Sequence, residues 1–135
     1  MPELLQLEVA TPERLLVNEQ VAEVQLPARD GYVGLLPGHA PLLAQLSRGF
    51  MHYTAGSRTW YLAVHGGFME VHDNHVRVLA DAAEPAEEID VERARQDMQR
   101  AQEALINPAV GVDPAVALGA VESAQARLDA ASHKE

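Results

Sequence analysis

The sequence contains no cysteine and a single lysine, Lys134, near its end. Without cysteine the chain forms no disulfide, no thiolate metal site and no thiol nucleophile. A phosphate-binding P-loop needs glycines followed by a lysine and a hydroxyl residue, and no such segment is present. None of the four serines lies in a Gly-x-Ser-x-Gly motif. The sequence therefore offers no group for covalent catalysis or phosphate transfer, and we expect no catalytic residue.

Positive charge is scarce, with ten basic residues against twenty acidic ones and a net charge of -10. Such a surface repels the phosphates of nucleic acids and anionic lipids. No apolar segment approaches the roughly 20 residues that cross a bilayer, and residues 1–3 do not resemble a signal peptide. We therefore expect a soluble chain in the cytoplasm, without a nucleic-acid partner.

Residues 1–85 show the short alternating segments and frequent turn residues of an antiparallel β-sandwich. In residues 21–26, Ala22, Val24 and Leu26 share one face, while Glu23 and Gln25 share the other. Further strands are expected at residues 4–10, 15–18, 50–54, 59–64, 68–72 and 76–79, with a two-residue turn at Asp73–Asn74. The pattern predicts eight to ten strands.

Residues 86–135 change to helical spacing and form a second predicted domain, a helical hairpin. Asp90 is the expected N-cap of the first helix, and Asp113–Pro114 begins the second. The two antiparallel helices present apolar stripes, Val91, Ala94, Met98, Ala101 and Leu105 on the first and Ala117, Val121, Ala124, Leu128 and Ala131 on the second. Because many of these side chains are alanine, we expect the hairpin to dock weakly and to detach at modest cost.

Three polar or apolar clusters are candidate sites. The turn at 73–74 would place His72 opposite His75, and with His65 these residues are the basis of one alternative, a small metal-dependent β-sandwich enzyme. The apolar loop around His39, residues 35–43, is either a plug for the core or a docking surface. The hairpin arginines form either an anion site or a charged face exposed to solvent.

Two specific strings of residues carry a resemblance to a known family. They are Gly31-Tyr32-Val33-Gly34-Leu35-Leu36-Pro37-Gly38-His39-Ala40-Pro41-Leu42 and Asn74-His75-Val76-Arg77-Val78-Leu79-Ala80-Asp81. In this order, and followed by a helix pair, they resemble the epsilon subunit of the bacterial-type rotary ATP synthase. The resemblance spans the whole chain and implies a ten-stranded β-sandwich followed by a helical hairpin.

The resemblance implies a non-catalytic rotor subunit that needs no cofactor and no metal. Its partners would be the gamma subunit, the c-ring and, transiently, the catalytic alpha/beta head, whose ATP hydrolysis the hairpin would inhibit. Tyr32, Leu36 and His39 would contact the c-ring, so that the chain lies at the cytoplasmic face of the bacterial inner membrane and meets the membrane only through the ring.

Some members of that family bind ATP as a regulatory ligand through an Ile/Leu-Asp-x-x-Arg-Ala motif. Ile89, Asp90, Arg93 and Ala94 reproduce this motif, and Arg100 and Arg127 are the further arginines of the implied site. The ATP-binding members carry two arginines one turn apart on the second helix, whereas Ser123 precedes Arg127 here. This departure predicts weakened ATP binding. A free-standing ATP sensor remains a further alternative function.

Overall fold

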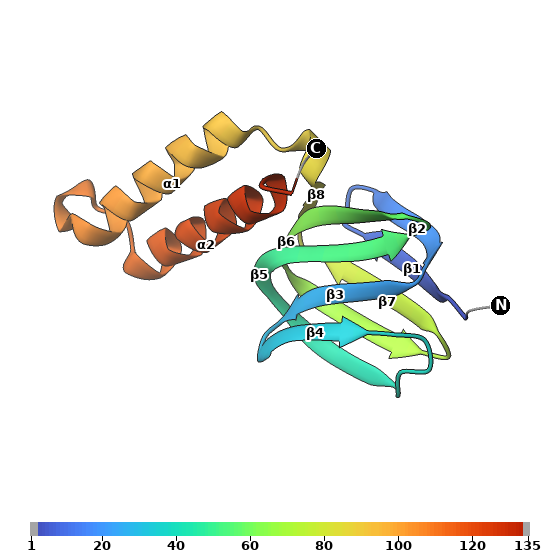
Figure 1. Ribbon diagram of the computed structural model, residues 1–135. Coiled ribbons are helices and arrows are strands. Elements are labelled where there is room, and N and C mark those ends of the chain that lie inside the picture. The colour runs from blue at the N-terminus through green and yellow to red at the C-terminus, as the bar shows by residue number, and fades with distance from the viewer. Residues whose placement is uncertain (1–2, 134–135) are drawn as a thin grey trace.

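The computed structural model describes residues 3–133, so Lys134, noted above as the single lysine, lies outside the described residues. It shows a β-sandwich followed by two packed helices (Figure 1), which confirms the predicted fold class. The strands are β1 (Leu5–Ala10), β2 (Leu15–Val21), β3 (Glu23–Ala28), β4 (Gly31–Leu35), β5 (Leu42–Ala55), β6 (Arg58–His72), β7 (His75–Ala80) and β8 (Ala83–Pro85). The helices are α1 (Val91–Ile106) and α2 (Pro114–Ala131), with short 3₁₀ turns at Ala86–Glu88 and Pro108–Val110.

The strands pair in the order β2-β1-β7-β6-β5-β3-β4, and β8 pairs with β6. All pairs are antiparallel except β1 with β7. The long strands β5 and β6 belong to both layers of the sandwich. Their Leu42–Leu46 and Gly67–His72 parts join β7, β1 and β2 in the first layer, while their Arg48–Ala55 and Arg58–His65 parts join β3, β4 and β8 in the second.

The described chain has eight strands, at the low end of the predicted eight to ten and below the ten implied by the family resemblance. The reason is that residues 59–64 and 68–72, predicted as two strands, form the single strand β6. Gly66 and Gly67 interrupt its regular backbone with φ angles of +78° and +114°, but pairing continues on both sides. Glycine reaches these angles at low cost, so the strand turns from one layer into the other without ending.

Alternation places the core where the sequence predicted it, with Val24 and Leu26 buried. Ala22 was expected on the same face but is exposed, because it lies at the bend between β2 and β3. The Asp73–Asn74 turn is confirmed: both residues have positive φ angles, and His72 pairs directly with His75. The core joins the inner faces of the two layers, with Leu5, Leu7, Met51, Leu62, Met69 and Val78 among its most buried members.

The helices begin at the expected residues. Asp90 accepts a hydrogen bond from the Arg93 backbone N–H, and Asp113 accepts one from Ala115. Ala94, Met98 and Ala101 are buried on α1, and Ala117 and Ala124 on α2, as the stripes predicted. Leu105, predicted on the α1 stripe, is instead 40% exposed, because it lies in the last turn of α1 at the end of the hairpin away from the sandwich. A second face of α2 packs on the outside of the second layer, where Ala126 and Ala130 bury against Ala63. No described helix is long and apolar enough to cross a bilayer.

Gly67 provides a test of the two-layer strand. A Cβ atom at this position would lie 2.2 Å from the Leu79 carbonyl oxygen, on a backbone that already has a φ of +114°. We therefore expect Gly67→Ala to lower the free energy of unfolding by on the order of 3 kcal/mol, measured by urea denaturation. Gly34→Ala is the matched control, since nothing lies within 4 Å of its Cβ position. Equal stability of the two variants would contradict this account of β6.

Candidate functional site

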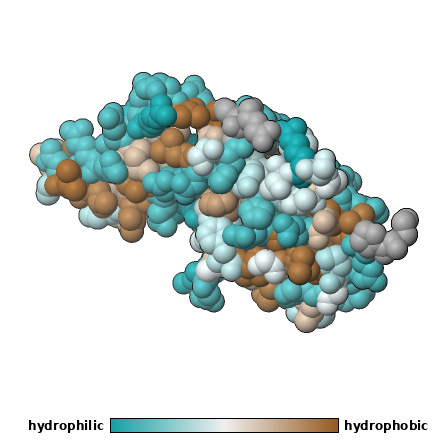
Figure 2. Space-filling view, viewed as in Figure 1, coloured by the Kyte–Doolittle hydropathy of each residue, from teal (hydrophilic) through white to brown (hydrophobic). Residues whose placement is uncertain are grey.

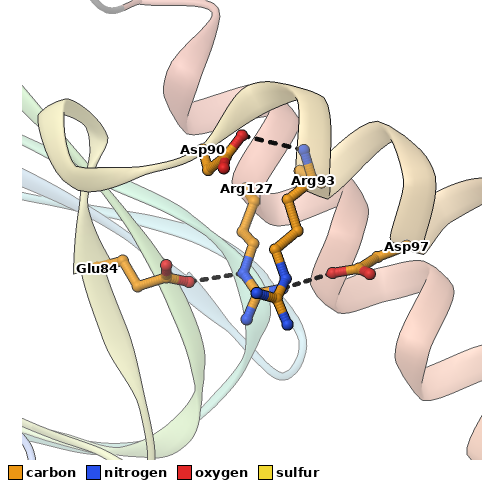
Figure 3. A pocket seen from close by; sticks show the side chains of 6 residues that line it. Glu84, Asp90, Arg93, Asp97 and Arg127 are labelled. Carbon is orange, nitrogen blue, oxygen red and sulfur yellow. Dashed lines mark hydrogen bonds and ion pairs between the residues drawn. The ribbon is translucent and has the colours of Figure 1, made fainter.

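The junction between the sandwich and the hairpin encloses a cavity of about 470 Å³, lined by Glu84, Asp90, Arg93, Ala94, Asp97 and Arg127 (Figure 3). Three segments supply these residues. Glu84 belongs to β8, residues 90–97 to the start of α1, and Arg127 to the last turns of α2. The cavity exists because β8 pairs with β6 and so delivers the chain to the start of α1 beside the end of α2.

The N-terminal turn of α1 positions the Arg93 side chain at this cavity. The Asp90 carboxylate caps α1 by accepting the Arg93 backbone N–H at 3.1 Å. The cap sets the direction of the first turn, from which the Arg93 side chain extends beside that of Arg127 (Figure 3). No hydrogen bond or ion pair joins the Arg93 guanidinium to another described side chain. A ligand could therefore bind the Arg93 guanidinium without displacing a described side chain.

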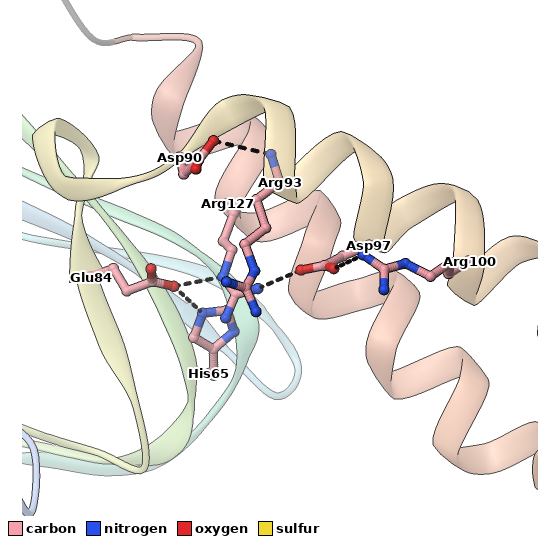
Figure 4. Close-up of polar contacts among 7 residues, drawn as sticks. All are labelled: His65, Glu84, Asp90, Arg93, Asp97, Arg100 and Arg127. Atoms are coloured by element: carbon pink, nitrogen blue, oxygen red, sulfur yellow. Dashed lines mark hydrogen bonds and ion pairs between the residues drawn. The ribbon is translucent and has the colours of Figure 1, made fainter.

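Arg127 is already engaged by carboxylates of the chain itself (Figure 4). Its Nε donates to Glu84 Oε1 at 2.6 Å, and its Nη1 lies 3.6 Å from Asp97 Oδ2. Asp97 in turn accepts from Arg100 Nη2 at 3.2 Å. This network ties β8 to both helices. Any anion that binds Arg127 must compete with Glu84.

His65 of β6 stands next to the network, with Nε2 3.4 Å from Glu84 Oε1. The two side chains form an ion pair when the imidazole is protonated. His65 and then Arg127 lower the pKa of Glu84 to about 2, although partial burial of the carboxyl raises it. Glu84 is therefore ionised at any pH near neutrality, and its charge balances that of Arg127.

The structure brings most of the residues of the ATP motif together. Asp90, Arg93, Ala94 and Arg127 all line the cavity. Ile89 is buried with Ala63, Ala126 and Ala130 and fixes the start of α1 on the sandwich instead of lining the cavity. Arg100 reaches the site only through Asp97 and borders a separate apolar groove between the helices.

Sequence reasoning missed Glu84, Asp97 and His65 as members of this site. The i to i+3 spacing of Asp97 and Arg100 indicated their pair. Nothing local indicated Glu84, which contacts a residue 43 positions away, or His65, which reaches the site through strand pairing.

The three residues expected at the c-ring lie along one edge of the sandwich but not in one patch. Tyr32 is near the start of the edge strand β4, where its ring packs 5.6 Å from Phe50, whereas Leu36 and His39 follow the end of that strand. The Gly38 backbone N–H donates to Asn74 Oδ1 at 2.7 Å and so fixes the loop to the β6–β7 turn. Leu36 is 60% exposed, so the loop does not plug the core.

The histidines of the metal-enzyme alternative do not converge. His72 and His75 face each other at the β6–β7 turn, and His65 lies in the other layer beside Glu84. Within residues 3–133 no three His, Asp or Glu side chains are placed to hold a metal ion. What remains is a site with two guanidinium groups and three carboxylates, a composition that suits an ionic latch between β8 and the helices better than a strong anion site.

Comparison with known proteins identifies the family. A family model described as the ATP synthase, Delta/Epsilon chain, beta-sandwich domain matches residues 4–86. The ATP synthase epsilon chain of Solibacter usitatus (strain Ellin6076) is 58% identical over 134 residues, which are 99% of this chain and 100% of the relative. The epsilon chain of Nitratidesulfovibrio vulgaris (strain DP4) is 44% identical over 128 residues, 95% of this chain and 96% of the relative.

Solved structures agree. A chain of the Euglena gracilis mitochondrial ATP synthase, from a structure of OSCP, F1 and c-ring, superposes with a TM-score of 0.84 at 27% identity, covering 98% of this chain and 84% of that one. A chain from the central stalk and c-ring of the Tetrahymena thermophila enzyme, with a TM-score of 0.58 and 13% identity over 97% of this chain and 96% of that one, shows the fold alone. The chain thus belongs to the epsilon chains of ATP synthase and is a non-catalytic subunit of that enzyme.

Proposed function

We propose that the chain is a rotor subunit of the central stalk, which links the gamma subunit to the c-ring and so couples proton flow to ATP synthesis. The solved relatives come from structures that contain a c-ring, and one of these is described as a central stalk. A net charge of -10 favours a subunit that meets the cytoplasmic face of the bacterial inner membrane only through the ring.

One observation carries the proposal: an apolar row crosses the outer face of the first layer. Strand register places Leu15 of β2, Ala10 of β1, Leu79 of β7 and Phe68 of β6 side by side. Leu15, Leu79 and Phe68 are each more than half exposed, as is Leu43 of the neighbouring β5. Beyond this row, Figure 2 shows apolar side chains on the helical hairpin and on the side of the sandwich that faces the viewer. A continuous apolar surface of this kind marks a protein interface, and we assign it to the gamma subunit.

The edge of the sandwich formed by β4 is the surface that we propose for the second rotor contact. Within residues 3–133, β4 has no strand partner on one side. Tyr32 and Leu36, both about half exposed or more, lie at its two ends, with His39 beyond. We assign this edge to the c-ring. The gamma row and the ring edge are then separate surfaces of one rigid body, as a torque-carrying subunit requires.

The hairpin is the regulatory part of the proposed function. It lies on the outer face of the second layer, opposite the gamma row, and contacts the sandwich mainly through alanine side chains and the Glu84–Arg127 pair. Because this contact is small, the hairpin can leave the sandwich and reach the alpha/beta head, where it would inhibit ATP hydrolysis.

We propose the junction cavity as a weak site for ATP as a regulatory ligand. Arg93 offers a guanidinium group to the phosphates, whereas Arg127 is held by Glu84 and Asp97. Three carboxylates facing two guanidiniums oppose a triphosphate, which agrees with the weakening expected from Ser123. The chain needs no ATP for its coupling role.

The proposed contact with the gamma subunit can be tested by placing a charged side chain in the apolar row. Phe68→Asp should raise the dissociation constant for the purified gamma subunit by about 30-fold or more, because it places an unpaired charge in an apolar interface. Isothermal calorimetry measures this change. Val116→Asp is the control, since Val116 is also more than half exposed but lies on the hairpin. Unchanged affinity of the Phe68 variant, or an equal loss in both variants, would contradict the assignment.

The nucleotide site predicts opposite effects of two substitutions. Arg93→Ala should remove the calorimetric heat of ATP binding to the full chain, and Glu84→Gln should strengthen binding several-fold by freeing Arg127. Arg95→Ala is the control, because Arg95 pairs with Glu92 outside the cavity. An isotherm that Arg93→Ala leaves unchanged would exclude ATP from this site.

A further inference from the structure

The outer face of the second layer, on which the hairpin rests, is unusually rich in histidine and aromatic side chains. Directly opposed residues of β5 and β6 form three cross-strand pairs there, Arg48 with His65, Phe50 with Ala63, and His52 with Tyr61. The face therefore carries a histidine at each end and an apolar pair between them.

Helix α2 and the residues that follow it cover this face along its length. A Cβ atom on Gly119 would lie 3.3 Å from the Arg48 guanidinium, and Ala126 and Ala130 pack on Ala63. Beyond the end of α2, His133 stacks on Tyr61, with ring centroids 4.1 Å apart and an angle of 8° between the planes. His133 also contacts Phe50 at 5.6 Å. A third histidine thus closes the face at the His52 end.

His52 is held in a way that suits the neutral imidazole. Its Nε2 lies 3.1 Å from Gln25 Oε1, and its Nδ1 is buried without a hydrogen-bond partner among the described residues. An imidazolium carries a proton on both nitrogens. Charging His52 would therefore bury an N–H donor without an acceptor, which is costly.

Charged groups lie at both ends of this face. Burial lowers the pKa of His52 and is the largest effect; the nearby Glu23 carboxylate opposes this shift, and His133 adds to it. At the other end, His65 faces Glu84 together with the cations Arg127 and Arg48. Because the pKa of Glu84 is about 2, its ion pair with Arg127 does not change between pH 5 and 8.

We propose that this face is a proton-sensitive joint, in which protonation of His52 beneath the docked end of α2 releases the hairpin from the sandwich. Only the docked hairpin places His133 and Tyr61 together over the His52 end of the face. The joint rests on the hairpin detachment proposed above and would make that detachment respond to acidification, without depending on the gamma contact.

The direction and size of the pH effect on hairpin docking follow from proton linkage. A histidine exposed by undocking returns toward a pKa of about 6.5, so the undocked state binds more protons than the docked one. Docking is then fully favourable above this pH and weakens as the pH falls through it. Between pH 7.5 and pH 6 the ratio of undocked to docked chains should rise by up to about fourfold.

The full chain can be tested directly, because it has no cysteine of its own. Ser57→Cys in the β5–β6 turn and Val116→Cys on exposed α2 provide positions for a donor and an acceptor dye. Single-molecule energy transfer then measures the docked fraction in solution. We expect the low-transfer population to grow by up to about fourfold from pH 7.5 to pH 6.

Variants assign the response to His52. His52→Gln and His52→Phe, the second of which keeps a ring against Tyr61, should both abolish the pH dependence, and His39→Gln, far from the joint, should keep it. A docked fraction that does not change with pH would overturn the proposal. So would a response that survives both His52 variants or that only His65→Gln removes.

Discussion

The contact between α2 and the outer face of the second layer governs the behaviour of this molecule. It consists of alanine side chains on Ala63, a histidine stacked on Tyr61 and one short ion pair between Glu84 and Arg127. Alanines bury little apolar area, and an ion pair that stays one-third exposed contributes little net stability. The hairpin is consequently positioned by specific contacts but weakly held.

The sandwich, unlike the contact with the hairpin, is held together by large buried side chains and shared strands. Its core joins large side chains from both layers, and β5 and β6 run through both, so that the layers cannot shift independently. The apolar row lies on the outer face of one layer and the hairpin on that of the other. A rotor partner can therefore occupy the first face whether or not the hairpin is docked on the second. This separation would allow one small chain to serve the proposed rotor role and to carry the proposed movable hairpin.

Local patterns in the sequence predicted much of this architecture. The alternation at Val24 and Leu26, the turn at Asp73–Asn74 and the caps at Asp90 and Asp113 each depend on neighbouring residues, and all are confirmed. The features that were missed depend on distant residues. Glu84 gains its role from Arg127, and Gly67 continues a strand because it can approach the Leu79 carbonyl. The joint at His52 requires two strands and the end of α2, which no local pattern indicates.

Removing residues 86–135 tests most directly whether a rigid sandwich carries a separable hairpin. The remaining residues 1–85 should fold with nearly the unfolding free energy of the full chain and bind the gamma subunit with unchanged affinity, while ATP hydrolysis by the assembled head should increase. Loss of folding or of gamma binding in this shortened chain would show that the hairpin is an integral part of the sandwich and would contradict the account.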